Sequence, residues 1–324
     1  RGNRTQFSYK SSSIHITYIF ASAMKIINYF FFRFFVFGFK FVPFWMIYRL
    51  SNFIAFLLHR VLRYRYQVIK ENLNLINSPI LTEKGGPDIR EIYRNLADIM
   101  LESIKGFSMS KETLQKRHKW VNPEILEDTF KQQKSVILVT GHFNNWEWGA
   151  FSPNYFLKHK IIGLYKPLTN EYINRYMLRK RASSGTVLAN INDTSQYFKN
   201  YHDKNAIFLM AADQSPTKPE LAIWTTFLGV ETPCLHGIEK YYQQYKLPVI
   251  YCDIQRVDRG YYAISLEWVH EDISIEVDKG EITKSFMKKL EKRIEINSES
   301  WLWSHRRWKH ADRAFERRNA ILSD

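Results

Sequence analysis

Cysteine is scarce in this chain of 324 residues, which contains only Cys234 and Cys252. Two cysteines provide neither a disulfide framework nor a cysteine-based zinc site, and this scarcity fits a reducing cytoplasm. The sequence also lacks an internal repeat, a phosphate-binding P-loop and the glycine fingerprint of dinucleotide-binding domains. Disulfide-stabilised, repeat and typical nucleotide-binding proteins are therefore disfavoured as classes.

Acidic residues are outnumbered by basic ones, 32 against 47, so the formal net charge is +15. This balance suits an anionic partner such as nucleic acid, an anionic membrane surface, a phosphorylated lipid or an acidic carrier protein. Hydrophobic residues make up 45% of the chain. A chain of this length and composition can form one large α/β domain with a small appendage.

No charge-free run is long enough to cross a bilayer, although residues 24–62 form the most apolar region. Arg33, Lys40, Arg49 and Arg60 interrupt this region, whereas a spanning helix needs about 20 predominantly apolar residues. Aromatic residues mixed with cations favour helices that lie in the membrane interface. A single tilted span and a buried aromatic hairpin remain as alternatives.

The composition divides the chain into three parts. Residues 1–23 are polar and rich in serine, and we expect a disordered extension there. We expect residues 24–62 to be a membrane-associating helical segment and residues 63–324 to be the α/β domain.

Short apolar runs alternate with amphipathic stretches in the α/β domain, which predicts a mixed central sheet flanked by helices. The central strand is expected at residues 136–139, where four branched apolar residues stand together. Further strands are expected at 160–165, 186–188, 205–212, 248–254 and 261–269, and helices at 89–105, 123–133, 172–180 and 281–296.

His142 and Glu147 follow the central strand, at the edge where open α/β sheets usually bind ligands. If His142 lies in the turn and Glu147 in the first turn of a helix, capped by Asn144 or Asn145, the two side chains can meet. The pair would then be a histidine base with a carboxylate that orients it. Alternatively, Asn144 and Glu147 form a capping box and Glu147 is purely structural.

Residues 141–147 read Gly-His-Phe-Asn-Asn-Trp-Glu, and residues 301–309 read Trp-Leu-Trp-Ser-His-Arg-Arg-Trp-Lys. Both stretches, and the elements between them, resemble the lipid A biosynthesis acyltransferases, the late acyltransferases of Gram-negative lipopolysaccharide assembly. The resemblance runs from about Met24 to Lys309. It implies a glycerolipid acyltransferase-like fold with His142 and Glu147 as catalytic residues.

The same resemblance implies a set of substrate-binding residues. Lys166 stands in Tyr-Lys-Pro where the family usually has Tyr-Arg-Pro, so it keeps the charge without the arginine fork. The set that matches family motifs is Asn145, Lys166, Arg181, Asp213, Gln214 and Arg307.

A direct acyl transfer is the reaction that the resemblance implies, at the cytoplasmic face of the inner membrane of a Gram-negative bacterium. The donor would be an acyl carrier protein thioester, or acyl-CoA, and the acceptor a hydroxyl of a lipid A precursor. His142 would take the hydroxyl proton, while backbone N–H groups near residues 144–146, with Arg181 or Lys166, would hold the oxyanion. Neither a metal nor a cofactor is required.

Three alternatives stay open at this point. A related acyltransferase could modify another lipid or glycolipid. Cys234 near His236 could act as a nucleophile, although a small buried filler is the more ordinary role of such a residue. The basic, tryptophan-rich terminus could bind single-stranded nucleic acid without catalysis, but the apolar residues 24–62 argue against that partner.

Overall fold

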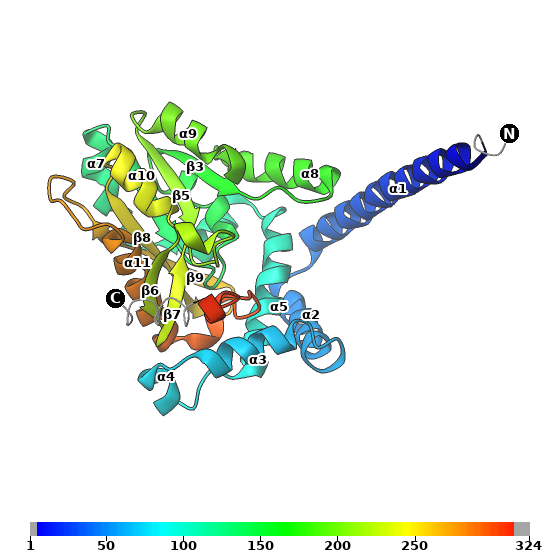
Figure 1. Cartoon of the computed structure of the whole chain (residues 1–324), viewed down its shortest axis with the longest axis horizontal. Coiled ribbons are helices and arrows are strands. Elements are labelled where there is room, and N and C mark those ends of the chain that lie inside the picture. Colours follow the sequence, from blue (N-terminus) through cyan, green and yellow to red (C-terminus); the bar gives the residue numbers. More distant parts are fainter. Residues whose placement is uncertain (1–4, 314–324) are drawn as a thin grey trace.

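A seven-stranded sheet with helices on both faces forms the centre of the computed structural model, which describes residues 5–313, with side chains from residue 22 (Figure 1). The strands are β1 (His118–Trp120), β2 (Val136–Thr140), β3 (Lys160–Tyr165), β4 (Val187–Asn190), β5 (Ala206–Ala211), β6 (Ile223–Phe227), β7 (Val230–Cys234), β8 (Val249–Asp258) and β9 (Tyr261–His270).

The α-helices are α1 (Thr5–Phe41), α2 (Phe44–Phe56), α3 (Tyr66–Leu75), α4 (Pro79–Glu83), α5 (Ile89–Gly106), α6 (Lys111–Arg117), α7 (Glu127–Lys131), α8 (Glu171–Ala182), α9 (Thr194–Tyr201), α10 (Gly237–Tyr245) and α11 (Glu281–Ile296). A π-helix covers Leu57–Val61, and 3₁₀ turns cover Pro123–Leu126, Trp148–Ala150, Pro153–Tyr155, Ile191–Asp193, Pro219–Leu221 and Ser298–Ser300.

The strand order is β1-β9-β8-β2-β5-β3-β4, and β6 and β7 form a separate antiparallel pair. Strands β8, β2, β5, β3 and β4 are parallel to one another, while β9 runs antiparallel to β8 and β1 runs parallel to β9. The prediction of a mixed α/β sheet is confirmed. The five parallel strands end at one edge, and the candidate site is built there.

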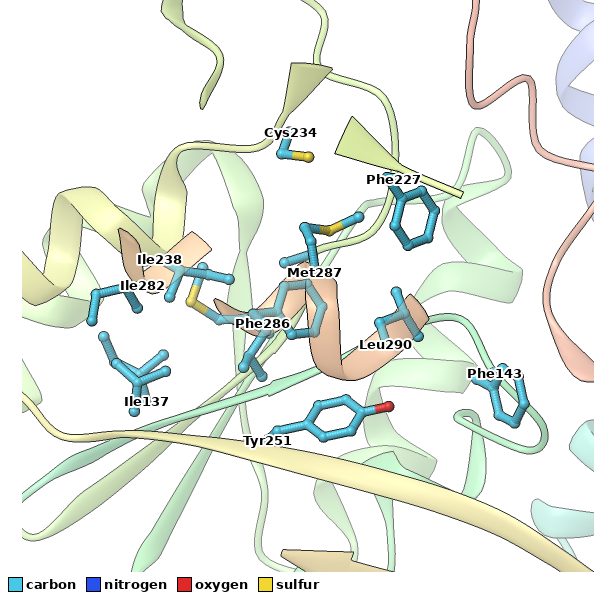
Figure 2. Close-up of a cluster of buried hydrophobic side chains, with 14 of the residues drawn as sticks. Ile137, Phe143, Phe227, Cys234, Ile238, Tyr251, Ile282, Phe286, Met287 and Leu290 are labelled. Atoms are coloured by element: carbon cyan, nitrogen blue, oxygen red, sulfur yellow. The ribbon is translucent and has the colours of Figure 1, made fainter. Parts of the chain in front are cut away.

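The central strand β2 is buried on both faces. Ile137 and Val139 belong to the core beneath α10 and α11, whereas Val136 and Leu138 point to the opposite face. Figure 2 shows the first of these cores, in which Phe286 of α11 packs among apolar side chains from the sheet. This double burial explains why the strand reads as a continuous apolar run rather than an alternating one.

The predicted strands are confirmed, but two helical expectations were wrong. No α-helix follows β2, where the chain forms turns and the 3₁₀ turn Trp148–Ala150. The helix expected at 123–133 is divided into a 3₁₀ turn and the short α7. The strand β1 and the β6–β7 hairpin were not predicted.

Helix α1 projects away from the body and carries the chain's N-terminal part (Figure 1). It begins at Thr5, so it continues through most of the segment that we expected to be disordered, and residues 1–4 lie outside the described part. Within it, Ser22–Phe41 is long and apolar enough to cross a membrane. Residues 314–324 of the expected α/β domain also lie outside the described residues.

Aromatic side chains are exposed along α1 and α2 rather than packed in a hairpin core. Phe34, for example, is 73% exposed. A surface of this kind marks a site of membrane or protein contact. We call it the aromatic belt, and its members are Phe30, Phe31, Phe34, Phe35, Phe37, Phe41, Trp45, Phe53 and Phe56.

Candidate active site

The ends of two neighbouring strands bring the principal polar side chains together. Strands β2 and β5 pair in parallel with Thr140 opposite Ala211, so the chain leaves both strands at the same edge of the sheet. His142 lies two residues beyond Thr140, and Asp213 lies two residues beyond Ala211. Because each residue follows its paired strand residue by two positions, the two side chains lie next to each other.

Asp213 holds the His142 ring and backbone at once. Its Oδ1 lies 2.6 Å from His142 Nδ1, and its Oδ2 accepts the His142 backbone N–H at 2.8 Å. The indole N–H of Trp301 donates to the same Oδ2 at 2.8 Å. The Asp213 side chain is 2% exposed. Three donors thus fix a carboxylate that is withdrawn from water.

Gly141 makes this close approach possible. A Cβ atom at this position would lie 2.8 Å from Leu290 Cδ1 and 3.2 Å from Asp213 Oδ2. The first distance is shorter than real Cβ contacts allow, so a larger residue would force the Leu290 side chain to shift and would crowd the Asp213 carboxylate. The absence of a side chain at Gly141 therefore lets Leu290 and Asp213 lie close to the backbone before His142.

The two partners shift each other's pKa in opposite directions. Burial by itself raises the pKa of Asp213, but the facing His142 and the hydrogen bonds from His142 and Trp301 lower it to about 2. Burial lowers the pKa of His142, but Asp213, and more weakly Glu147, raise it above its ordinary value. The pair therefore favours an ionised carboxylate beside a histidine that readily accepts a proton.

The hydrogen bonds also assign the tautomer of His142. Because Nδ1–H donates to the Asp213 carboxylate, Nε2 is the unprotonated ring nitrogen and carries the lone pair. The side-chain amide nitrogen of Gln214 lies 3.2 Å from Nε2 and can donate to it. The Trp146 ring packs edge-on against the imidazole, with the ring centroids 5.2 Å apart. His142 thus presents a basic nitrogen on the side away from Asp213.

Glu147 does not orient His142 in this structure. Its Oε2 forms an ion pair with Arg181 Nη2 of α8 at 2.6 Å. The carboxylate on the imidazole is that of Asp213, which we had expected to bind substrate. The expected His142–Glu147 contact depended on a helix after β2, and the turns that form there direct the Glu147 side chain towards α8.

The capping-box alternative is not formed either. Asn144 has a left-handed φ of 51°, and its backbone N–H donates to the Ser300 carbonyl. Asn145 makes the contact that was expected of Asn144: its side-chain oxygen accepts the backbone N–H of Trp148, three residues later. The Asn144 N–H is therefore engaged, and in the described part of the chain the segment after β2 provides no α-helix N-terminus to hold an oxyanion.

A cavity of about 400 Å³ opens beside His142 and extends over the sheet. Four of the other predicted site residues line it, namely Glu147, Lys166, Arg181 and Gln214. Apolar side chains form most of the remaining wall, among them Trp120, Leu164, Met177, Leu188, Leu209 and Ile254. The lining therefore combines His142 and a few other polar side chains with a largely apolar wall.

Three predicted substrate-binding residues lie outside this cavity. Asp213 is behind His142, as described above. Asn145 is fully buried, and its side-chain amide donates to the carboxylate of Glu102 at 2.6 Å. Arg307 is also fully buried and donates to the Pro233 carbonyl at 2.8 Å. None of these three described side chains lines the cavity beside His142.

The C-terminal tryptophans are part of the core. Trp301, Trp303 and Trp308 are 3%, 0% and 4% exposed. Buried rings cannot stack on the bases of a nucleic acid, which is how such proteins bind single strands. Trp301 instead holds Asp213, a role that the sequence did not reveal.

The two thiols are not placed for nucleophilic attack. Cys234 lies in the core near Phe227 and Met287 (Figure 2), and burial raises the pKa of its thiol. His236 lines a different cavity from His142. Cys252 lines the wall beside His142, but burial raises the pKa of that thiol too. A nucleophilic cysteine needs a lowered pKa, the opposite of both shifts.

Comparison with known proteins identifies the family. The model of the bacterial lipid A biosynthesis acyltransferase family matches residues 18–310. The chain is also 22% identical over 286 residues to the lipid A biosynthesis lauroyltransferase of Escherichia coli (strain K12), an overlap of 83% of this chain and 87% of that protein. The family match spans α2 to α11 and every strand, so the chain belongs to the bacterial lipid A biosynthesis acyltransferase family.

Proposed function

We propose that this acyltransferase moves a fatty acyl chain from a thioester to a hydroxyl of a lipid A precursor. The donor carrier is acyl carrier protein, with coenzyme A as the alternative. The observation that supports this most directly is the unprotonated Nε2 of His142 beside a largely apolar cavity, with Asp213 held behind the ring.

His142 acts as the general base in this proposal. Nε2 takes the proton of the acceptor hydroxyl as its oxygen attacks the thioester carbonyl, and Asp213 stabilises the resulting imidazolium. The tetrahedral intermediate then collapses, the carbon–sulfur bond breaks, and the imidazolium returns the proton to the leaving thiolate. The products are an ester and a free thiol, so atoms and charge balance without a covalent enzyme intermediate.

Cations in the cavity lining stabilise the developing oxyanion. Arg181 and Lys166 both line the cavity, and Gln214 adds an amide donor next to Nε2. Glu147 keeps Arg181 in place by the ion pair and adds negative charge near the imidazolium. Donors fixed before the reaction stabilise a transition state without reorganisation at the moment of transfer.

The apolar part of the cavity receives the acyl chain, and the aromatic belt brings the enzyme to its lipid acceptor. Arg33, Lys40, Arg49 and Arg60 accompany the belt and can meet lipid phosphates at the cytoplasmic face of the inner membrane. Exposed aromatic rings beside cations suit the interfacial depth of a bilayer. This arrangement lets a thioester enter from the aqueous side and a lipid from the membrane.

The test is transfer by the purified full-length protein in vesicles that contain a lipid A precursor, with an acyl carrier protein thioester or acyl-CoA as donor. We expect the mass of the precursor to rise by one acyl group, faster with the carrier protein, and the His142→Ala variant to give no product. Acylation of a different membrane lipid, with the precursor unchanged, would contradict the proposed acceptor.

A further inference from the structure

Helix α5 carries a stripe of polar side chains that are almost fully buried. Asn95, Asp98, Glu102 and Lys105 are 7%, 0%, 0% and 8% exposed. Their spacing of three, four and three residues places them on one face of the helix. Charged residues are rarely fully buried unless they are paired, so we followed the partners of this polar stripe.

Two residues of the stripe bind hydroxyl groups of α2, the helix that carries part of the aromatic belt. Ser51 Oγ donates to Asp98 Oδ1 at 2.5 Å, and Tyr48 Oη donates to Glu102 Oε1 at 3.0 Å. Ser51 is fully buried, while part of α2 remains exposed. The inner side of α2 is thus joined to α5 by two hydrogen bonds about one helical turn apart, one of them buried and the other partly buried.

The third charged residue of the stripe holds α1. Lys105 Nζ donates to the carbonyls of Phe39, Lys40 and Val42 at 2.7, 3.1 and 2.9 Å. The first two carbonyls lie in the last turn of α1 and the third directly after it, where backbone acceptors are unpaired and the helix dipole favours a cation. Both helices of the membrane-associating segment are therefore attached to α5.

On its other side, Glu102 binds the loop that follows His142. Its Oε2 accepts the side-chain N–H of Asn145 at 2.6 Å and the hydroxyl of Tyr262 at 2.7 Å. Its backbone carbonyl accepts the indole N–H of Trp148 at 2.9 Å. Asn145 in turn binds the Trp148 amide. The Glu102 side chain thus contacts both the membrane-associating segment and residues 143–148, which we call the catalytic loop.

The part of the loop that Glu102 fixes carries two groups of the site. Between Asn145 and Trp148 stand Trp146, which packs on the His142 ring, and Glu147, which pairs with Arg181. Fixing both ends of this four-residue stretch restricts where these two side chains can lie. A shift of Glu102 would therefore move these two side chains.

Asp98 and Glu102 differ in how their charge is balanced. Asp98 forms ion pairs with Arg256 and Arg259, whereas the hydrogen bonds to the Glu102 carboxylate come from neutral hydroxyl and amide groups. The Glu102 donors come from α2, from the loop after His142 and from β9, so this carboxylate joins three parts of the chain. Asp98 instead joins α5 to α2 and to the end of the β8–β9 hairpin.

We propose that Glu102 is a positioning residue that couples docking of α2 on the membrane to the geometry of the catalytic loop, through Tyr48 on one side and Asn145 on the other. The catalytic consequence rests on the acyl transfer proposed above. The coupling between α2 and the catalytic loop does not depend on that reaction, because it concerns contacts within the protein. It can be measured without turnover.

A matched pair of variants tests the coupling, since Tyr48 and Tyr262 both donate a hydroxyl to Glu102 but only Tyr48 belongs to α2. The measurement is amide hydrogen exchange of residues 143–148, with and without vesicles of anionic phospholipid. Vesicles should increase the protection of this loop in the wild-type protein and in Tyr262→Phe. In Tyr48→Phe that increase should disappear, although the variant still sediments with vesicles.

Two results would overturn the coupling. One is a loop whose exchange in the wild-type protein does not respond to vesicles, and the other is an equal response in both tyrosine variants. Neither result depends on which lipid is acylated, so failure of the proposed reaction is recognised separately as the absence of product from the wild-type enzyme.

Substitution of Glu102 itself tests its effect on the reaction. Glu102→Gln retains an acceptor for Asn145 and Tyr262, and its amide can donate to the Tyr48 oxygen, so transfer should stay within about threefold of wild type. Glu102→Ala removes all three contacts and should lower kcat about tenfold or more with a smaller change in KM. Equal losses in the two variants, or a loss confined to thermal stability, would contradict a positioning role.

Discussion

Two buried carboxylates, Asp213 at the sheet edge and Glu102 on α5, differ in what they can do. Each accepts three side-chain or backbone hydrogen bonds, which is what makes burial of a carboxylate tolerable. The pKa of Asp213 is lowered by His142, whereas burial raises the pKa of Glu102 despite the nearby Arg256. Only Asp213 faces a group that can gain and lose a proton next to a cavity.

The comparison teaches that burial and a shifted pKa do not by themselves identify a catalytic carboxylate. Structural networks perturb pKa values as strongly as active sites do. The distinguishing features are the partner and its access to a ligand. His142 lines the cavity and Glu102 does not. The first variants should therefore separate an effect on turnover from an effect on the stability of the fold.

His142→Ala should have the largest effect on activity. Removal of a general base is expected to lower kcat by about 10⁴-fold, at the upper end for proton transfer. Asp213 keeps the Trp301 indole and the backbone N–H of residue 142 as donors, so the fold should persist. Turnover measured with a saturating thioester, beside a melting curve, checks this. A folded variant with near-normal turnover would refute His142 as the base.

Asp213→Asn should come next, with a fall of about 10²- to 10³-fold. The amide oxygen can still accept from the His142 N–H and the Trp301 indole, while the amide NH2 donates to His142 Nδ1. His142 is then held in the tautomer that carries its proton on Nε2, so the base is lost while thermal stability should change little.

The pH profile of Asp213→Asn provides a second readout. The negative charge of Asp213 raises the pKa of His142, so its removal should lower that pKa. Because the base must be neutral, activity is lost as pH falls through the His142 pKa, and the acidic limb of kcat/KM should move to lower pH. An unchanged acidic limb would mean that another group controls it.

Glu147→Gln should have a smaller effect, of about 10- to 100-fold, because Glu147 acts on His142 from a distance and through Arg181. The pair is partly exposed, with side chains 27% and 15% accessible, so stability should change by no more than about 1 kcal/mol. Kinetics beside a melting curve again provide the measurement. A variant as inactive as His142→Ala would give Glu147 a direct part in the chemistry, and full activity would make it structural.

The sheet and the location of the site could be predicted from the sequence because both depend on local patterns. Branched apolar runs mark buried strands, and polar residues that follow them mark the carboxyl edge. The partner of His142 could not be read from spacing, since Asp213 lies 71 residues away in the chain. The pairing of β2 with β5 decides it, and strand pairing is a tertiary property.

The role of α5 was hidden for a related reason. Its apolar positions predicted a helix at 89–105, and the structure confirms it as Ile89–Gly106. Asp98 and Glu102 would ordinarily be assigned to the solvent side. They are buried because α2 covers them, and the hydroxyls of Ser51 and Tyr48 that make this tolerable belong to another helix.

The double variant Cys234→Ala, Cys252→Ala should have the smallest effect on activity. Both thiols are buried with raised pKa values, and direct transfer forms no acyl-cysteine intermediate. Some stability should be lost, about 1–2 kcal/mol, because both side chains fill core space and Cys234 also contacts Arg307. Turnover within about threefold of wild type, with no acylated cysteine in the intact-protein mass after incubation with the donor, is the expected result. An acyl adduct trapped on the wild-type enzyme and absent from the variant would place a thiol in the reaction path and remove the need for His142 to activate the acceptor directly.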